Sequence, residues 1–405
     1  NQHGVDEYAY LEEINTGGTL NYTLDGTSKL QYAYPSDPKT SYLTWETIAT
    51  WNIGLDMSFL NSRLNFTGDY FIRDTEGMLA KSYVLPSVFG AKEPKENCAD
   101  LRTKGWELSL NWNDSFALMG KRFNYTVSAS LGDNKTVITK YNNPEKLLTD
   151  YYEGMVLGEI WGYRIDGLFA SDEEATEYTS KINQDFVNAR ILSDKVEPYY
   201  RAGDLKFRDL DGDNIISKGD DTAYDAGDRE IIGNETPRYN YSFRLGADWN
   251  GFDLGIFFQG VGKRDWYPNY LSTGFWGPYS RAFTSFIPAN FMDQCWSEEN
   301  PGGYFPRFRG YQTFKDSQLG VNNDRYLQDA SYIRLKNLTV GYTLPVLKKV
   351  FTKLRVYFTG ENLWYWSPMK KYTKYIDPEA AGGNGNTGMA YNYSRNFSVG
   401  VDITF

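Results

Sequence analysis

Residues 394–405 carry the feature that most constrains the fold, a strict two-residue alternation of apolar and polar side chains. The apolar positions are Phe397, Val399, Val401, Ile403 and Phe405. Because successive side chains of a β-strand point to opposite faces, this segment predicts a strand with one apolar and one polar face. Soluble antiparallel sheets contain such strands. In a membrane-spanning sheet, the apolar face meets lipid and the polar face meets water.

The same alternation recurs along the chain and predicts about nine strands. They fall at residues 46–59, 63–76, 105–113, 122–137, 238–250, 252–265, 332–344, 354–367 and 394–405. Several reach the nine to eleven residues that cross a bilayer at a tilt. In the strand at 332–344 the apolar positions change from odd to even numbers, which predicts a β-bulge near Lys336–Asn337. The alternative is that Leu338 starts a new segment.

The connections between these strands alternate between short and long. The short ones are residues 61–62, 114–121, 251 and 345–353, and the long ones are residues 77–104, 138–237, 266–331 and 368–393. Outer-membrane barrels have short periplasmic turns and long extracellular loops, whereas a soluble sandwich has no reason to sort its loops by length. We therefore expect an all-β fold, a transmembrane antiparallel β-barrel segment over residues 46–405. Residues 1–45 are then an extracellular loop segment or the end of a preceding strand.

Composition agrees with this class and excludes others. Aromatic residues make up 17% of the chain, and Tyr and Trp favour the two membrane interfaces. No stretch approaches the 18 apolar residues of a transmembrane helix. The net charge of −10 argues against a nucleic-acid partner. His3 is the only histidine, which nearly excludes histidine-based catalysis, so we predict no enzyme. Cys98 and Cys295 either pair or stay free, and the sequence leaves both readings open.

Nine strands do not complete a barrel. Single-chain bacterial barrels have an even number of strands, and an open sheet edge leaves unpaired backbone groups in lipid. We therefore expect further strands from another chain or from an upstream part of the same polypeptide.

Several segments resemble the SusC-like TonB-dependent transporters of Bacteroidetes, the SusC/RagA family. The segments are LPSVFG at 85–90, KGWE at 104–107, GDLKFRDLDGD at 203–213, IGN at 232–234, PRY at 237–239, YIRLKNLTVGY at 332–342 and GENL at 360–363. Their combination and order, from about residue 45 to residue 405, make the resemblance specific, although each segment alone is weak.

The resemblance implies a 22-stranded barrel with an N-terminal plug, of which this chain is the C-terminal portion without the plug. It implies TonB-dependent import of a glycan or oligopeptide across the bacterial outer membrane, with TonB contacted through the missing N-terminal part. It also implies a SusD-like surface lipoprotein as a lid. An alternative is a SusC-like structural subunit of a larger outer-membrane assembly. A third reading is a soluble, calcium-stabilised β-sandwich that binds carbohydrate.

An acidic segment matches the spacing of a calcium-binding loop. Asp209, Asp211, Asp213 and Asp220 stand at positions 1, 3, 5 and 12, and Ile215 at position 7 offers its carbonyl. Calcium needs six to eight oxygen ligands, which such a loop supplies, and the ion would stiffen the longest connection. The alternative is a solvated acidic turn, since Asp, Asn and Gly also favour turns. A glycosidase would need two carboxylates facing each other across a cleft, which a sequence cannot show. The calcium loop or the solvated turn explains these carboxylates more simply than a hydrolase does. We expect no organic cofactor.

Aromatic residues of the predicted extracellular regions are candidates for contacts with substrate or lid. They are Trp266, Tyr267, Trp276, Tyr279, Trp364 and Trp366. The alternative is that they form an aromatic girdle at the membrane interface or pack within the loops.

Overall fold

The structure is a computed structural model that describes residues 11–23, 26–40, 43–81, 88, 90, 92–188, 199–281, 283, 285, 287–310, 312–314, 317–345, 352–382 and 391–405. Most of the motif at 85–90 therefore lies outside the described residues. The chain divides into two compact units. The first comprises Asn1–Asn52, Phe71–Lys104 and Lys135–Leu157, and the second comprises Ile53–Tyr70, Gly105–Asn134 and Gly158–Phe405.

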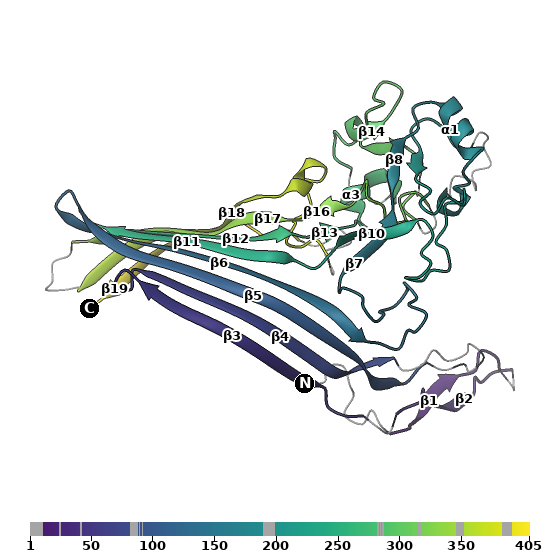
Figure 1. Ribbon diagram of the computed structural model, residues 1–405, viewed down its shortest axis with the longest axis horizontal. Coiled ribbons are helices and arrows are strands. Elements are labelled where there is room, and N and C mark those ends of the chain that lie inside the picture. Colours follow the sequence, from purple (N-terminus) through teal and green to yellow (C-terminus); the bar gives the residue numbers. More distant parts are fainter. Residues whose placement is uncertain are drawn as a thin grey trace. The chain divides into compact units, whose positions relative to one another are not determined.

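Nine strands form one large sheet in the described part of the chain (Figure 1), as the alternation predicts. Their order is β19-β18-β17-β12-β11-β6-β5-β4-β3, so strands that follow one another among the nine are neighbours. The bounds are β3 Thr47–Phe59, β4 Leu64–Lys81, β5 Lys95–Leu118, β6 Lys121–Lys140, β11 Arg238–Trp249, β12 Phe252–Lys263, β17 Tyr332–Leu344, β18 Lys353–Trp366 and β19 Asn396–Thr404.

The predicted loop at 77–104 is wrong at both ends, because β4 runs to Lys81 and β5 begins at Lys95. Apolar alternation fades there, but polar contacts continue to hold the strands. Arg102 Nε lies 2.6 Å from Asp74 Oδ1. The backbone N–H of Gly77 donates to the Asp100 carboxylate at 2.7 Å. Hydrogen-bonded polar pairs therefore extend this hairpin beyond its apolar stripe.

Tight turns explain the short connections. The predicted connection at 114–121 is also too long, since β5 continues to Leu118 and β6 begins at Lys121. Met119 and Gly120 between them have φ of 50° and 76°. Asn250 and Gly251 between β11 and β12 have φ of 50° and 87°. Two successive positive φ values define the type I′ turn, which matches the twist of a hairpin and favours Asn-Gly.

The predicted β-bulge in β17 is confirmed. Against β12, Asn337 pairs with Phe257 and Leu335 pairs with Phe258, so Lys336 is the extra residue of β17. Because of this insertion, Arg334 and Lys336 share the polar face, while Leu335 and Leu338 share the apolar face. The bulge therefore keeps two cations away from the apolar side of the sheet.

Short elements make up the rest of the second unit. The paired strands are β7 Glu159–Tyr163 with β10 Arg229–Asn234, β8 Ile165–Leu168 with β9 Leu205–Phe207, β13 Asp265–Trp266 with β16 Gln328–Asp329, and β14 Cys295–Trp296 with β15 Phe305–Arg307. The helices are α1 Asp172–Thr179 and α3 Thr273–Trp276, with 3₁₀ turns η2 Asp185–Asn188, η3 Gly277–Tyr279, η4 Met292–Gln294 and η5 Pro368–Lys371. In the first unit, β1 Ile14–Thr19 pairs with β2 Gln31–Pro35, a feature that the sequence analysis did not predict.

The long connections of the second unit, residues 158–237, 264–331 and 367–395, share one hydrophobic core; we call them the loop body. Its fully buried members include Leu205, Phe207, Ile216, Trp276, Tyr279, Phe305 and Tyr326. Figure 1 shows these elements gathered at the end of the sheet where β11 begins and β12 ends. Burying large aromatic side chains is strongly favourable, so these loops fold as a packed body. Among the described residues, no helix is long and apolar enough to cross a membrane.

Candidate functional site

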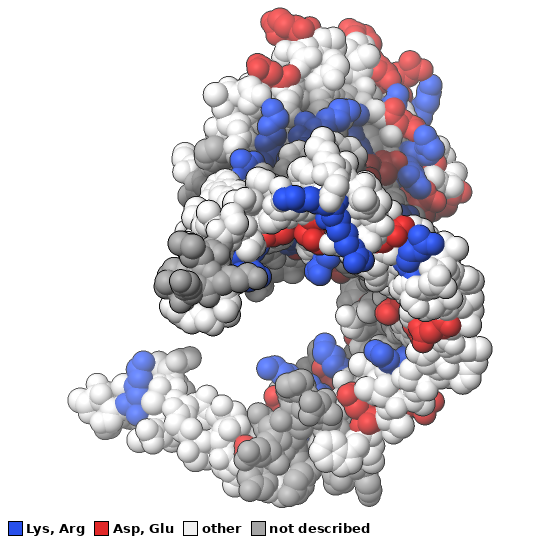
Figure 2. Space-filling view, turned by 90° about the vertical axis from the view of Figure 1, so that its left-hand side faces the viewer, with Lys and Arg blue, Asp and Glu red and all other residues white. Residues whose placement is uncertain are grey.

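The two faces of the large sheet differ in chemistry. Side chains on the polar face bond across neighbouring strands at 2.7–2.8 Å: Thr67 with Asp56, Ser128 with Asn111, Thr126 with Asn113, Ser130 with Ser242, and Asn124 with Asp248. The opposite face exposes the alternating apolar residues, including Ile53, Leu55, Phe252, Val399 and Val401. Figure 2 shows broad uncharged areas, with acidic and basic side chains next to each other in the middle of the view. An apolar face of this extent indicates contact with lipid or protein.

An ion triad crosses the polar face near the short connections. Arg355 on β18 lies 2.7 Å from Asp253 on β12 and 3.0 Å from Asp402 on β19. To reach Asp253, the guanidinium passes over β17 at Gly341. A Cβ at Gly341 would lie 2.4 Å from Asp253 Oδ1. The missing side chain at this position is therefore what lets Arg355 join three strands.

A buried cation fastens the loop body to the sheet. Arg334 on β17 is 1% exposed and pairs with Asp377. Its Nε lies 3.0 Å from Glu379 Oε2, a contact that is electrostatic because it is not aligned as a hydrogen bond. The guanidinium lies over the rings of Tyr365 and Tyr393, at 4.6 and 5.2 Å from their centroids. Residues 367–382 are thereby attached to the polar face.

Polar and aromatic contacts also join the long connections to each other. Asp204 is fully buried and pairs with Arg309 at 2.8 Å. Burial raises the pKa of Asp204, and the charge and hydrogen bonds of Arg309 oppose that rise. The rings of Tyr304 and Tyr372 stack with centroids 3.4 Å apart. The long connections of the loop body are therefore joined by ion-pair and ring contacts as well as by their shared core.

The acidic segment forms a tight loop whose carboxylates accept backbone hydrogen bonds. Asp209 accepts from the N–H groups of Gly212 and Asn214, at 2.7 and 2.9 Å. Asn214 has φ 66°, so it adopts the left-handed conformation that glycine normally supplies. Ile216 is buried in the core of the loop body and pins the end of the loop.

The structure brings together a different acidic set from the one that the spacing predicts. Ligand oxygens of Asp209, Asp211 and Asp228 lie within 4.8 Å of one another. Asp213 and Asp220 are not part of this group; a carboxylate oxygen of Asp213 instead accepts from the N–H of Ile215 at 2.6 Å. Three carboxylates at this separation suit a cation that is coordinated at 2.3–2.6 Å.

Asp228 is not predicted from the sequence, because it lies beyond the twelve-residue window and nothing in the linear spacing marks it. It is fully buried and accepts from the N–H groups of Leu210 and Ser217, at 2.7 and 2.8 Å. Burial raises the pKa of Asp228, and the neighbouring carboxylates of Asp211 and Asp209 add to the rise. A bound cation would relieve both effects.

Burial separates the aromatic candidates into two groups. Trp266, Trp276 and Tyr279 lie inside the loop body. Tyr267 packs against the same core and donates to the carbonyl of Val321 at 2.8 Å. For these four residues, burial favours packing within the loops over contact with substrate or lid.

Trp364 and Trp366 of β18 are 48% and 55% exposed. They pair in register with Leu335 and Ile333, which places them on the apolar face of the sheet. This position favours the alternative of an interfacial aromatic girdle.

Cys98 and Cys295 are both free thiols.

An antiparallel sheet with an exposed apolar face, a hydrogen-bonded polar face, tight turns at one end and long folded connections at the other defines the class of outer-membrane β-barrel proteins. The family described as "TonB dependent receptor-like, beta-barrel" matches residues 13–363. The chain belongs to this family.

Similar proteins and solved structures are consistent with this family membership. The chain is 28% identical to TonB-dependent receptor P26 of Formosa agariphila, over 98% of this chain and 38% of that protein. It is 24% identical to TonB-dependent receptor SusC of Bacteroides thetaiotaomicron, over 99% of this chain and 36% of that protein. The structure of the RagAB peptide transporter has a TM-score of 0.68 at 22% identity, over 98% of this chain and 39% of that chain. The chain thus spans less than two fifths of the length of these proteins, and the structural likeness shows the fold.

Proposed function

We propose that the protein carrying this chain imports a nutrient, a glycan or an oligopeptide, across the bacterial outer membrane in a TonB-dependent manner. The observation that carries the proposal is the two-faced sheet, apolar on one side and lined with hydrogen-bonded polar side chains on the other. Such a sheet separates lipid from an aqueous path. Membership of the TonB-dependent receptor family and similarity to SusC and RagAB support the same reading.

The proposed partner at the long-connection end is a SusD-like surface lipoprotein. The loop body supports a docking role because a surface that is already folded and held by internal contacts loses little entropy on binding. No catalytic role is proposed, since the family is one of receptors and transporters.

Uptake by living cells tests the proposal. A strain that lacks the gene should lose accumulation of its nutrient, and so should the wild type when the proton-motive force is collapsed. Competition between labelled glycans and labelled peptides then identifies the substrate class. Normal uptake of every tested glycan and peptide in the deletion strain, with the protein instead recovered in a complex of other membrane proteins, would replace transport with the assembly-subunit reading.

We also propose that Asp209, Asp211 and Asp228 bind a calcium ion that stiffens the acidic loop. The support is the mutual distance of their oxygens and the burial of Asp228. Calcium should slow proteolysis of residues 209–228 in the purified protein, and Asp211→Asn should abolish the effect. Asp220→Asn is the matched control, since Asp220 lies outside the group and should change nothing. If Asp220→Asn abolishes the calcium response as well, the ligand set is the one from the linear spacing.

A further inference from the structure

Two lysines stand side by side on the apolar face of the large sheet, Lys104 of β5 and Lys135 of β6; we call them the lysine pair. Both side chains are exposed. They lie where the apolar stripe of these strands ends, on the side of the long connections. We propose that the lysine pair binds the phosphate group of a lipid headgroup.

The register of β5 and β6 places the two lysines opposite each other. Side-chain hydrogen bonds on the polar face, each of 2.8 Å, join Thr126 with Asn113, Ser128 with Asn111, and Thr103 with Thr136. All three pairs fit one antiparallel register, and in that register Lys104 faces Lys135. Because neighbouring residues of a strand point to opposite faces, this pair lies on the apolar face. Like charges directly opposite each other destabilise a sheet, so the arrangement lowers stability unless an anion lies between the ammonium groups.

Acidic side chains beside the lysine pair are already occupied. Asp74 on β4 is within electrostatic reach of Lys104. Its two carboxylate oxygens, however, accept from Nε and Nη2 of Arg102 at 2.6 and 3.0 Å. Asp133, two residues before the second lysine on the same strand, is held by two nitrogens of Arg238. Among the described residues, neither lysine forms a hydrogen bond or an ion pair.

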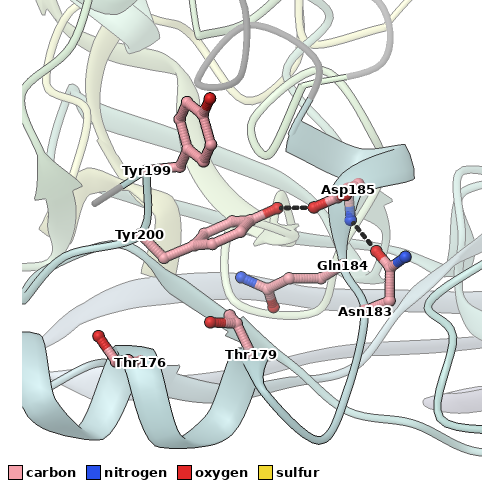
Figure 3. A pocket seen from close by; sticks show the side chains of 7 residues that line it. All are labelled: Thr176, Thr179, Asn183, Gln184, Asp185, Tyr199 and Tyr200. Carbon is pink, nitrogen blue, oxygen red and sulfur yellow. Dashed lines mark hydrogen bonds between the residues drawn. The ribbon is translucent and has the colours of Figure 1, made fainter. Parts of the chain in front are cut away.

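The loop body shows how this protein holds a charge with its own side chains. In the pocket beside α1, the Asp185 carboxylate accepts from the hydroxyl of Tyr200 at 2.8 Å (Figure 3). In the core of the loop body, Asp204 pairs with Arg309 at 2.8 Å. In the part of the chain that the structure describes, the lysine pair lacks such an internal partner, which favours a partner outside the chain.

The position of the lysine pair along the strands matches the headgroup region of a bilayer. From Phe123, which begins the apolar stripe of β6, to Lys135 the strand extends about 40 Å. At a tilt of about 40° this is about 30 Å across the membrane, slightly more than the apolar band of about 25 Å. On β5, Trp106 is the next residue on the same face as Lys104 and suits the aromatic girdle of that boundary. The flexible lysine stems can then hold both ammonium groups at the level of the headgroups.

A lipid fits this surface better than a free anion does. The lysine pair borders an apolar surface that continues along both strands. The acyl chains of a lipid cover that surface while its phosphate accepts charge-assisted hydrogen bonds from both ammonium groups. A free phosphate would gain only the second contact. Because the long connections of outer-membrane barrels are extracellular, the lipid belongs to the outer leaflet.

Matched lipids test the proposal on the purified full-length protein in an uncharged detergent. The probes are monophosphoryl lipid A and the same lipid after removal of its phosphate by a phosphatase, and native mass spectrometry measures the bound fraction. If each lysine contributes about fivefold, the phosphorylated lipid should bind about 25-fold more tightly than its dephosphorylated form. Inorganic phosphate at the same concentration as the lipid should not displace it.

Variants separate this site from general attraction to a basic surface. Lys104→Gln and Lys135→Gln should each weaken binding of the phosphorylated lipid about fivefold, and Lys104→Arg should retain binding because it keeps the charge. Lys140→Gln is the matched control: it removes the same charge from β6, but alternation places Lys140 on the polar face, so binding should not change. Without lipid, the double glutamine variant should melt no lower than the wild type, because it loses the repulsion between the two lysines.

Three results would overturn the proposal. They are equal binding of the phosphorylated and dephosphorylated lipids, equal losses of binding in Lys104→Gln and Lys140→Gln, and displacement of the lipid by an equal concentration of inorganic phosphate. The inference is independent of transport, because binding is measured without uptake, so a failure of either proposal leaves the other standing.

Discussion

Arg334 offers the sharpest test of how the loop body is held to the sheet. Replacing it with Gln leaves the buried Asp377 without its cation, whereas Glu379 keeps Lys336 at 2.7 Å. Removing one partner of a buried ion pair costs about 3 to 5 kcal/mol. At about 4 kcal/mol, local opening of the attached segment becomes about 1,000-fold more frequent.

Hydrogen exchange measures this opening directly. The N–H groups of Ala380 and Ala381 both donate to the carbonyl of Asp377 at 3.0 Å, so their exchange reports release of the segment. Arg334→Gln should speed exchange of both amides by at least about 100-fold. Arg63→Gln is the control: Arg63 is 47% exposed in its pair with Asp114, and exposed pairs contribute less than about 1 kcal/mol.

A double variant separates charge from packing. Asp377→Asn combined with Arg334→Gln removes both charges, so the pair of changes should cost at least about 1.5 kcal/mol less than the sum of the single costs. Additive costs, or unchanged exchange at Ala380 in Arg334→Gln, would refute the assignment of this ion pair as the anchor.

Three further outcomes follow from the same geometry. Gly341→Ala should lower the stability by about 1 to 3 kcal/mol, because the new Cβ would push Arg355 away from Asp253. Gly255→Ala is the control and should have a much smaller effect, because a Cβ there meets nothing within 4 Å. Equal losses of stability for the two variants in melting experiments would contradict this reading. Deleting Lys336 removes the bulge residue and shifts the register of β17 against β12, so the yield of heat-resistant protein in outer membranes should fall sharply. Because burial raises the pKa of Asp228, protons compete with calcium as the pH falls, and the calcium needed to protect the loop from protease should be higher at pH 5.5 than at pH 7.5.

Much of the large sheet could be predicted from the sequence, because each strand records its two environments in its own alternation. The change of phase between Leu335 and Leu338 even located the bulge. The ends of β4 and β5 escaped prediction, since beyond the apolar stripe they are held by pairs such as Asp74 with Arg102, which leave no periodic signal.

The candidate site was harder to predict because it depends on contacts distant in sequence. The Asx-rich turn predicted Asp209 and Asp211 from local spacing, but Asp228 reaches them only through the return of the chain toward β10. In sequence, Trp276 and Tyr279 are as compatible with a binding surface as with a core. They are core residues because side chains from other connections pack against them. Local sequence patterns thus predicted the large sheet, whereas tertiary packing determined which residues of the long connections are buried.

The shared core of the loop body limits how these connections can vary during evolution. Phe207, Trp276 and Ile376 come from three different connections yet pack in one cluster. A connection that changes alone would leave its neighbours with uncovered aromatic rings, so a graft from a relative should succeed only when all three are transferred together. Recognition surfaces built on this scaffold are therefore expected to diversify as a coordinated set, with single-residue changes concentrated on the solvent side.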